Sequence, residues 1–384
     1  MIGCSLKQMN GSSRSHLKAT QNWLHHPYSR MNYPPFTIIS AREITTMQLP
    51  NVILLVVLTM ITASQDCMKL YSNQGYKLTN HRYRQSSGLD MMTCFMSCKR
   101  ETSCQSVNYQ MEDSLCEMNN RTRESKPKHF MRAQLWLYFD NPYKTLIGSS
   151  MSLPGKSCKD IRNSSPELQL ANKEYWIDPG NSMQPFTVYC DMNTDGGGWT
   201  LIASTVVNVD NDTIGDMLRT SNYRSISNYS INSLRIDVPA IRELRDTMGF
   251  TQLRYHCFKK SVKRTFHVIT KKNDYGEKVL KYFTQDGEKQ TSSCNSYFRG
   301  PGDNSFLASN CNRWGHHGNS SALGKWGFYK HNGTYRIYNE PAYWNGDGSN
   351  KYFINFIPGR LCCDEDKNDC NYLSVGDFWK LYVK

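Results

Sequence analysis

The C-terminal third of the chain contains a group of acidic side chains that could bind a cation. Four carboxylates lie within six residues between Cys363 and Cys370, at Asp364, Glu365, Asp366 and Asp369. Calcium takes six to eight oxygen ligands, several of them from carboxylates. We therefore name Asp364, Asp366 and Asp369 as candidate metal ligands. The alternative is a solvated acidic loop, which is the more ordinary role of such a charge run.

Aromatic residues are dense in the segment that precedes this loop. An aromatic face that is exposed on a loop can stack on a sugar ring, whereas the same side chain in a core only packs. We expect most of these residues to be core and at least one to be an exposed ligand platform. The aromatic residues are Trp314, Trp326, Phe328, Tyr329, Tyr343 and Trp344, and the candidate ligand-binding residues among them are Trp314, Trp326, Tyr343 and Trp344.

Fourteen cysteines indicate an oxidising compartment. No Cys-x-x-Cys pair occurs and histidines are sparse near the cysteine clusters, so zinc is the weaker explanation. N-glycosylation sequons after residue 65 agree with the secretory pathway. The sequons are at Asn120, Asn163, Asn211, Asn228, Asn319 and Asn332, and the sequence leaves open the pairing of Cys257, Cys294, Cys311, Cys362, Cys363 and Cys370.

An apolar run over Val52–Ala63 is too short to span a membrane and is typical of a signal-peptide core. Because Met47 begins a segment of ordinary signal-peptide length, we predict a signal peptide over residues 47–65. Residues 1–46 are then an unstructured extension, and the protein is secreted. The alternative is a type II signal anchor and a single-pass membrane protein, since basic residues outnumber acidic ones before the run.

The run Phe186–Leu201 predicts two strands joined by a turn. Apolar and polar residues alternate at its start, as in a half-buried strand. The glycines Gly196–Gly198 allow a sharp reversal of the chain. Another strand signal lies at Tyr175–Asp178, so Cys158 and Cys190 are placed to staple the first two strands. Such a disulfide would contribute roughly 3.5 to 4 kcal/mol on the loop-entropy model.

These residues resemble the opening of a fibrinogen-related domain, as found in fibrinogen C-terminal domains, ficolins and intelectins. The resemblance implies a mixed α+β domain over residues 158–384, with a calcium site and, beside it, a site for an acetylated or glycan ligand. The matching positions are Asp303 for the metal and Asn310 and Trp314 for the ligand, although the family has several acidic residues where this chain has Asp303 alone. The motifs are Cys158-Lys-Asp-Ile161, Tyr175-Trp-Ile-Asp-Pro179, Phe186-Thr-Val-Tyr-Cys-Asp-Met192 and Gly197-Gly-Trp-Thr-Leu201.

Residues 66–140 form a small cysteine-rich segment. Apolar residues recur at helical spacing from Leu89 to Met96, and Cys94 and Cys98 project from one face of that helix. A segment of this size needs staples in addition to its small core. The segment resembles a PAN/apple module, and the resemblance implies disulfides between Cys98 and Cys104 and between Cys94 and Cys116.

Two features of this module bear on its connections. Residues 141–157 contain Pro, Gly and Ser without periodicity and are predicted to be a linker. Cys67 has no counterpart between Cys116 and Cys158, unlike the fuller apple pattern. Pairing across domains, pairing with another chain and a free thiol all stay open. A disulfide-linked homo-oligomer through Cys67 is our hypothesis.

The C-terminal domain is predicted to contain one clear helix, Ser233–Gly249, among many short strands. The chain carries a net charge of +13, which favours anionic partners such as sulfated or sialylated glycans. Its densest basic cluster is as basic as a nucleic-acid site, but the extracellular signals argue against nucleic acid, and a solvated face is the simpler interpretation. The cluster comprises Lys259, Lys260, Lys263, Arg264, Lys271 and Lys272.

No catalytic motif is present: the sequence has no HExxH, GxSxG, P-loop or suitably placed GxGxxG pattern. We therefore predict a recognition protein that binds glycans or extracellular proteins, lectin-like and with calcium assistance as an option. The alternative is a structural or adhesive matrix component without a small-ligand site. An enzyme would require a histidine and a nucleophile that converge in one cleft.

Overall fold

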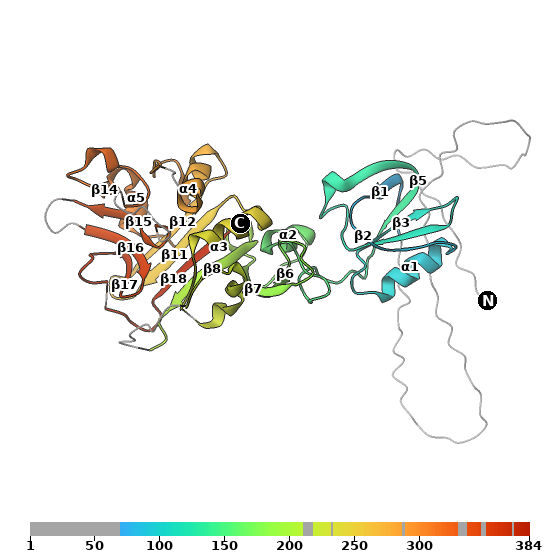
Figure 1. Ribbon diagram of the computed structural model, residues 1–384, viewed down its shortest axis with the longest axis horizontal. Coiled ribbons are helices and arrows are strands. Elements are labelled where there is room, and N and C mark those ends of the chain that lie inside the picture. The colour runs from blue at the N-terminus through green and yellow to red at the C-terminus, as the bar shows by residue number, and fades with distance from the viewer. Residues whose placement is uncertain are drawn as a thin grey trace, which may run out of the picture. The chain divides into compact units, whose positions relative to one another are not determined.

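The computed structural model describes residues 70–209, 218–231, 233–285, 289–328, 336–346, 351–370 and 372–384. The chain divides into two compact units, Met1–Thr145 and Leu146–Lys384 (Figure 1). No described helix has the length and apolar character of a membrane span. The predicted extension, the signal peptide, Cys67, Tyr329 and the sequons at Asn211 and Asn332 all lie outside the described residues.

The first unit consists of one antiparallel sheet with a helix packed on it. Asp90 caps the helix by accepting a hydrogen bond from the Thr93 amide at 2.9 Å. Two disulfides, Cys94–Cys116 and Cys98–Cys104, join the helix to β4 and to the segment before β3, the pairs that the resemblance implied. The strands run in the order β1-β5-β3-β4-β2. The elements are β1 Ser72–Leu78, β2 Arg82–Ser86, α1 Met91–Arg100, β3 Ser106–Gln110, β4 Leu115–Asn119, a 3-10 turn Pro127–His129 and β5 Phe130–Asp140.

The second unit is organised around a large sheet. Its main path is β13-β12-β11-β18-β8-β10-β9, with β6 and β7 attached through β8. The strands are β6 Lys173–Ile177, β7 Phe186–Asp191, β8 Trp199–Val206, β9 Leu218–Thr220, β10 Ser233–Ile236, β11 Leu253–Lys259, β12 Arg264–Thr270, β13 Tyr297–Arg299 and β18 Phe378–Val383. The two units together confirm the predicted α+β class.

Helices and 3-10 turns accompany this sheet. They are α2 Cys158–Ser164, α3 Val238–Met248, α4 Asp274–Thr284, α5 Phe306–Ser309, η2 Thr194–Gly196, η3 Tyr223–Ile231, η4 Cys311–Arg313 and η5 Ser320–Ala322. The predicted helix over Ser233–Gly249 is wrong in its first residues. Asp237 caps α3 by accepting from the Ala240 amide, and Pro239 suits a first helical turn, so Ser233–Ile236 forms a strand instead.

The predicted staple joins a helix to a strand. Cys158 is the first residue of α2, not part of a strand, and it bonds Cys190 on β7. The glycine turn that follows requires Gly197, because a Cβ at this position would lie 1.9 Å from the Met192 carbonyl oxygen and its φ is +72°. The turn therefore sets how β7 passes into β8.

The segment predicted as a linker is divided between the units at Thr145. From Leu146 onward it is part of the second unit, where Ile147 and Leu153 are buried in the same core as Ile161 of α2. The Ile177 strand end also bridges to Gly155. Apolar residues in a Pro- and Gly-containing stretch were the signal for this packing.

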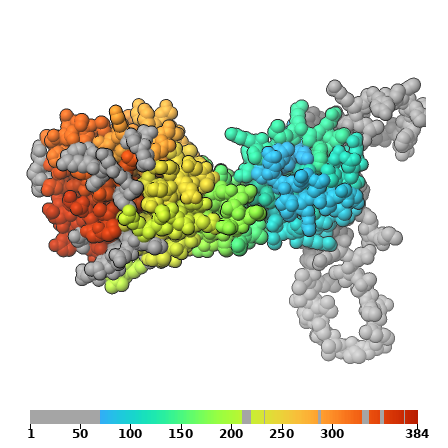
Figure 2. All heavy atoms as spheres, in the orientation of Figure 1, coloured from blue at the N-terminus to red at the C-terminus, as the bar shows by residue number. Residues whose placement is uncertain are grey.

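A smaller sheet, β14-β15-β16-β17, completes the second unit. Its strands are β14 Gly315–His316, β15 Asn339–Asn345, β16 Lys351–Ile357 and β17 Arg360–Glu365. The Cys257–Cys363 disulfide ties β17 to β11, and the buried Lys259 pairs with Glu365 at 2.8 Å. Lys259 thus does not belong to a solvated basic face. In Figure 2 the segment coloured orange to red packs directly against the yellow segment of the same unit.

Because each unit has its own disulfides, we expect the loss of one disulfide to destabilise only the unit that contains it. Replacing Cys158 and Cys190 by Ser should lower the unfolding free energy of the second unit by about 3.7 kcal/mol, because the unfolded chain regains the entropy of a loop with separation 32. Differential scanning calorimetry of the full chain should show one transition lowered by roughly 10 °C. The control, Cys98→Ser with Cys104→Ser, should lower the other transition. A shift of the same transition by both variants would contradict the division.

Candidate ligand-binding surface of the C-terminal unit

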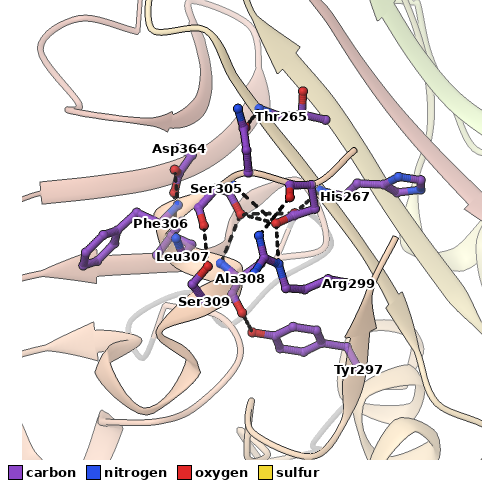
Figure 3. A network of polar contacts seen from close by, with 12 residues as sticks. Thr265, His267, Tyr297, Arg299, Ser305, Phe306, Leu307, Ala308, Ser309 and Asp364 are labelled. Atoms are coloured by element: carbon purple, nitrogen blue, oxygen red, sulfur yellow. Dashed lines mark hydrogen bonds and ion pairs between the residues drawn. The ribbon is translucent and has the colours of Figure 1, made fainter. Parts of the chain in front are cut away.

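Asp303 is the centre of an internal polar network between β12, β13 and α5, and its partners His267, Arg299 and Ser305 are labelled in Figure 3. One carboxylate oxygen accepts from the His267 amide at 2.6 Å, and the other accepts from the Arg299 Nε at 2.8 Å. The Ser305 hydroxyl lies 3.2 Å from each oxygen. Only 1% of the side chain is exposed, so this carboxylate orders the loop before α5 and is closed to a solvent ion.

Asp364 fixes the start of α5. Its two carboxylate oxygens accept from the amides of Phe306 at 2.6 Å and Leu307 at 2.9 Å (Figure 3). The Nη1 of Arg264 lies 3.4 Å from one of these oxygens. Burial raises the pKa of Asp364 to about 6, although the two amide hydrogen bonds act in the opposite direction. Ser305 adds a cap by accepting from the Ala308 amide. Because Asp364 belongs to β17, this strand fixes the position of Phe306 at the start of α5.

The predicted calcium ligands are not brought together. Asp303 and Asp364 are buried and bonded to protein donors, which removes them as solvent-facing ligands. Asp366 and Asp369 lie on the turn after β17, where an Asp366 oxygen accepts from the Asn368 amide. Across the described ranges, no group of three His, Cys, Asp or Glu side chains is arranged to hold a metal ion.

Three of the predicted platform residues are core. Trp314 and Trp326 are fully buried, with their ring N–H groups donating to the Leu307 carbonyl and the Ser296 hydroxyl, both at 2.7 Å. Tyr343 is buried beside Phe353. The ligand-platform prediction therefore does not hold for these three, because no face of any of them is open to a ligand. Sequence spacing alone does not distinguish a loop tryptophan from a core one.

Trp344 is the predicted platform residue that is partly exposed. It lies directly opposite Tyr352 in the β15–β16 register, with ring centroids 5.8 Å apart and planes at 9°. Phe306 stacks on both rings, at 4.3 Å from Tyr352 and 5.2 Å from Trp344. All three side chains are partly exposed. We call Phe306, Trp344 and Tyr352 the aromatic cluster.

Two arginines border the aromatic cluster. The guanidinium of Arg313 lies 5.6 Å from the Trp344 ring, and that of Arg264 lies 5.0 Å from the Tyr352 ring. Arg264 also pairs with Asp364, whereas no described carboxylate pairs with the exposed Arg313. Such stacking is typical of cation–π contacts. The aromatic cluster thus presents three partly exposed rings beside the guanidinium of Arg313, which no described carboxylate neutralises.

Asn310 bonds the backbone of Phe306, a member of the aromatic cluster. Its side-chain amide donates to the Phe306 carbonyl at 2.9 Å and closes α5. The neighbouring Cys311 is bonded to Cys294. Asn310 therefore holds Phe306 in place through the backbone, and its role in this geometry is positioning. Arg313 lies two residues after Cys311 in the same 3-10 turn, so the disulfide also restrains the backbone of Arg313.

Sequence reasoning missed Phe306, Tyr352 and Arg313. A signal was present for Phe306, because Ser305 is a good helix cap and the first apolar residue after it begins a helix. For Tyr352 the signal was its alternation with the buried Phe353 in a strand that begins at Lys351. Nothing in the sequence places Arg313 over Trp344, since that contact depends on the fold.

The described sequons lie at accessible positions. Asn163 and Asn228 are exposed, and Asn120 and Asn319 are partly exposed. The structure therefore leaves room for glycans at the first two, and glycosylation itself stays a prediction.

The two classes of tryptophan predict different costs of truncation. Trp314→Ala should lower the unfolding free energy by about 3–5 kcal/mol, because it opens a cavity in a closed core. Trp344→Ala should cost no more than about 1.5 kcal/mol, mainly its stacking on two rings. Urea denaturation monitored by circular dichroism measures both. A Trp344→Ala variant as unstable as Trp314→Ala would show that Trp344 is a core residue.

Comparisons with known protein families agree with the two-unit division. Residues 65–143 match the PAN domain model, and residues 144–235 match the fibrillar collagen C-terminal domain model. A segment of 48 residues is 46% identical to the fibrinogen beta chain of Gallus gallus, and one of 49 residues is 47% identical to that of Bos taurus. Each segment covers 12% of this chain and 10% of the relative, so the chain spans about a tenth of these relatives' length.

Two solved structures are also similar over part of the chain. The fibrinogen-like globe domain of human ANGPTL2 is 13% identical, with a TM-score of 0.28, over 60% of this chain and 99% of that one. A lamprey fibrin D-dimer in complex with the peptide Gly-His-Arg-Pro-amide is 14% identical, with a TM-score of 0.26, over 60% of this chain and 73% of that one. From the sequence matches, the chain contains a PAN domain over residues 65–143 followed by a fibrinogen-related region.

Proposed function

We propose that this chain is a secreted recognition protein whose fibrinogen-related region binds an extracellular protein or glycan through the aromatic cluster and Arg313. The observation that carries the proposal is the stack of three partly exposed rings, at centroid distances of 4.3 to 5.8 Å, beside an arginine without a described acidic partner. Trp, Tyr and Arg are the side chains that contribute most to protein interfaces. Aromatic faces and edges also pack against sugar rings.

The aromatic cluster is held ready for binding. Phe306 is fixed by Asp364 through its amide and by Asn310 through its carbonyl. Trp344 and Tyr352 are fixed by cross-strand pairing. Because side chains that are already ordered lose little entropy on association, this rigidity favours affinity.

The cysteines support the proposed extracellular compartment. Six disulfides join described residues, and disulfides persist in oxidising environments. An extracellular position excludes nucleic acid as the ordinary partner. The homo-oligomer through Cys67 stays a proposal, for which a dimer on a non-reducing gel that becomes a monomer on reduction is the test.

Calcium is not expected to be required for binding at the aromatic cluster. The two carboxylates nearest to it, Asp303 and Asp364, are buried and saturated with protein donors. A chelator should therefore leave the affinity for the partner unchanged. Calcium dependence would direct attention to the partly exposed Asp366 and the exposed Asp369 instead.

The test is binding of the full secreted chain to a glycan array and to an array of extracellular proteins, each with and without calcium. Trp344→Ala should weaken binding to the ligand identified by about tenfold or more, as expected for a central interface aromatic. The control is Tyr275→Ala, which removes an exposed aromatic from α4 and should bind as the wild type. Unchanged binding by Trp344→Ala, or no ligand on either array, would contradict the proposal.

A further inference from the structure

One face of the large sheet carries a row of basic side chains that the aromatic cluster does not use. His256 on β11 lies opposite His267 on β12 and opposite Lys380 on β18. Arg254 precedes His256 by two residues, so its side chain leaves the same face of the strand. The two imidazole rings are stacked with centroids 4.0 Å apart. We call Arg254, His256, His267 and Lys380 the basic row.

Two members of the basic row are buried with polar atoms that have no partner. Arg254 is 1% exposed; its Nη2 contacts Asp191 at 2.8 Å, but its Nε and Nη1 have no hydrogen-bond partner among the described residues. His267 is 2% exposed; its Nδ1 lies 2.8 Å from the Pro301 carbonyl oxygen, but its Nε2 is likewise without a partner there. A buried polar group without a partner is destabilising, so such groups ordinarily have one.

The other two members of the basic row border the solvent. His256 and Lys380 are only partly buried. Among the described residues, no acceptor bonds the Lys380 ammonium, which lies 5.2 Å from the centre of the Phe378 ring. Figure 3 shows the His267 imidazole directed away from the other labelled side chains of the Asp303 network. The basic row therefore meets solvent at His256 and Lys380, and none of its members belongs to the aromatic cluster.

The charges around the basic row leave an excess of positive charge. Arg254 and Lys380 are cations, and Asp191 neutralises one of them. Asp303 also faces His267, but its carboxylate is bonded to the His267 amide and to Arg299. Burial of Lys380 lowers its pKa, and the nearby charge of Arg254 lowers it further. Burial of His256 and, to a smaller extent, the neighbouring His267 lower the pKa of His256 to about 2. An added anion would raise the pKa values of both Lys380 and His256, because a negative charge stabilises their protonated forms.

We propose that Arg254, His256, His267 and Lys380 form a binding site for one oxyanion group, a sulfate, phosphate or carboxylate, carried by a partner. The free N–H groups of Arg254 and the Lys380 ammonium donate to its oxygens. If the Nδ1 of His267 donates to Pro301, its Nε2 becomes a further donor only on protonation, so the site takes up a proton as the anion binds. Affinity therefore rises as the pH falls. The aromatic rings of Tyr382 and Trp199, 3.8 and 5.0 Å from the Arg254 guanidinium, exclude water and strengthen the charge interaction.

The experiment is titration of the full chain with sodium sulfate, sodium phosphate and sodium acetate, against sodium chloride at matched ionic strength. Isothermal calorimetry in two buffers of different ionisation enthalpy measures affinity and proton uptake. We expect saturable binding of at least one oxyanion, proton uptake, and tighter binding at pH 6 than at pH 7.5. The oxyanion that binds most tightly identifies whether a sulfate ester, a phosphate ester or an acidic side chain is the natural group.

Matched variants decide the location. Lys380→Met keeps the apolar stem and should weaken oxyanion binding about tenfold, since a charge-assisted hydrogen bond is lost. His267→Gln should reduce the proton uptake, because the Nε2 of His267 is the atom that takes up the proton. The control is Lys278→Met, which removes an exposed lysine of α4 and should bind as the wild type. Equal responses to chloride and to the oxyanions, or wild-type affinity in a Lys380→Met variant that keeps the wild-type circular dichroism spectrum, would overturn the proposal. Neither outcome depends on ligand binding at the aromatic cluster.

Discussion

A disulfide and a buried ion pair join two strands of the second unit that lie far apart in the sequence. Cys257 and Cys363, with a separation of 106, connect β11 to β17, and two residues further along each strand Lys259 pairs with Glu365. The Lys259 ammonium also donates to the carbonyls of Leu361 and Cys370, so all three of its protons have acceptors. Burial raises the pKa of Glu365 to about 7 despite the opposing effect of Lys259. Removing either partner would leave a buried charge, at a cost of about 3–5 kcal/mol.

The position of the aromatic cluster follows from this link. Asp364 lies between Cys363 and Glu365 at a bulge, where the register between β16 and β17 shifts and the φ of Asp364 is +59°. While its neighbours face β11, Asp364 accepts the first amides of α5 and thereby fixes Phe306. Trp344 and Tyr352 come from β15 and β16 of the same small sheet. A carboxylate that a sequence pattern assigns to calcium therefore serves to place an aromatic ring.

Local patterns predicted some elements well and others poorly. The strands around the glycine turn followed from alternation and from Gly197, whose backbone conformation no other residue adopts easily. The Cys94–Cys116, Cys98–Cys104 and Cys158–Cys190 bonds matched those expected. The pairs Cys257–Cys363, Cys294–Cys311 and Cys362–Cys370 were out of reach, because six cysteines allow fifteen connectivities and spacing does not choose among them.

Burial was the quantity that the sequence did not supply. Trp314 and Trp344 both lie in loop-like sequence, yet one is enclosed and the other is partly open, because burial depends on segments that are distant in the chain. Lys259 looked like part of a solvated basic face for the same reason. The basic row was missed because its members come from three strands whose register only the folded sheet reveals.

Hydrogen–deuterium exchange of the full chain, with and without its identified partner, locates the binding surface. The partner should slow exchange in Phe306–Arg313 and in the facing parts of β15 and β16, the segments that carry the aromatic cluster. Protection confined to the PAN domain or to the segments around α3 and α4, with these segments unchanged, would contradict it.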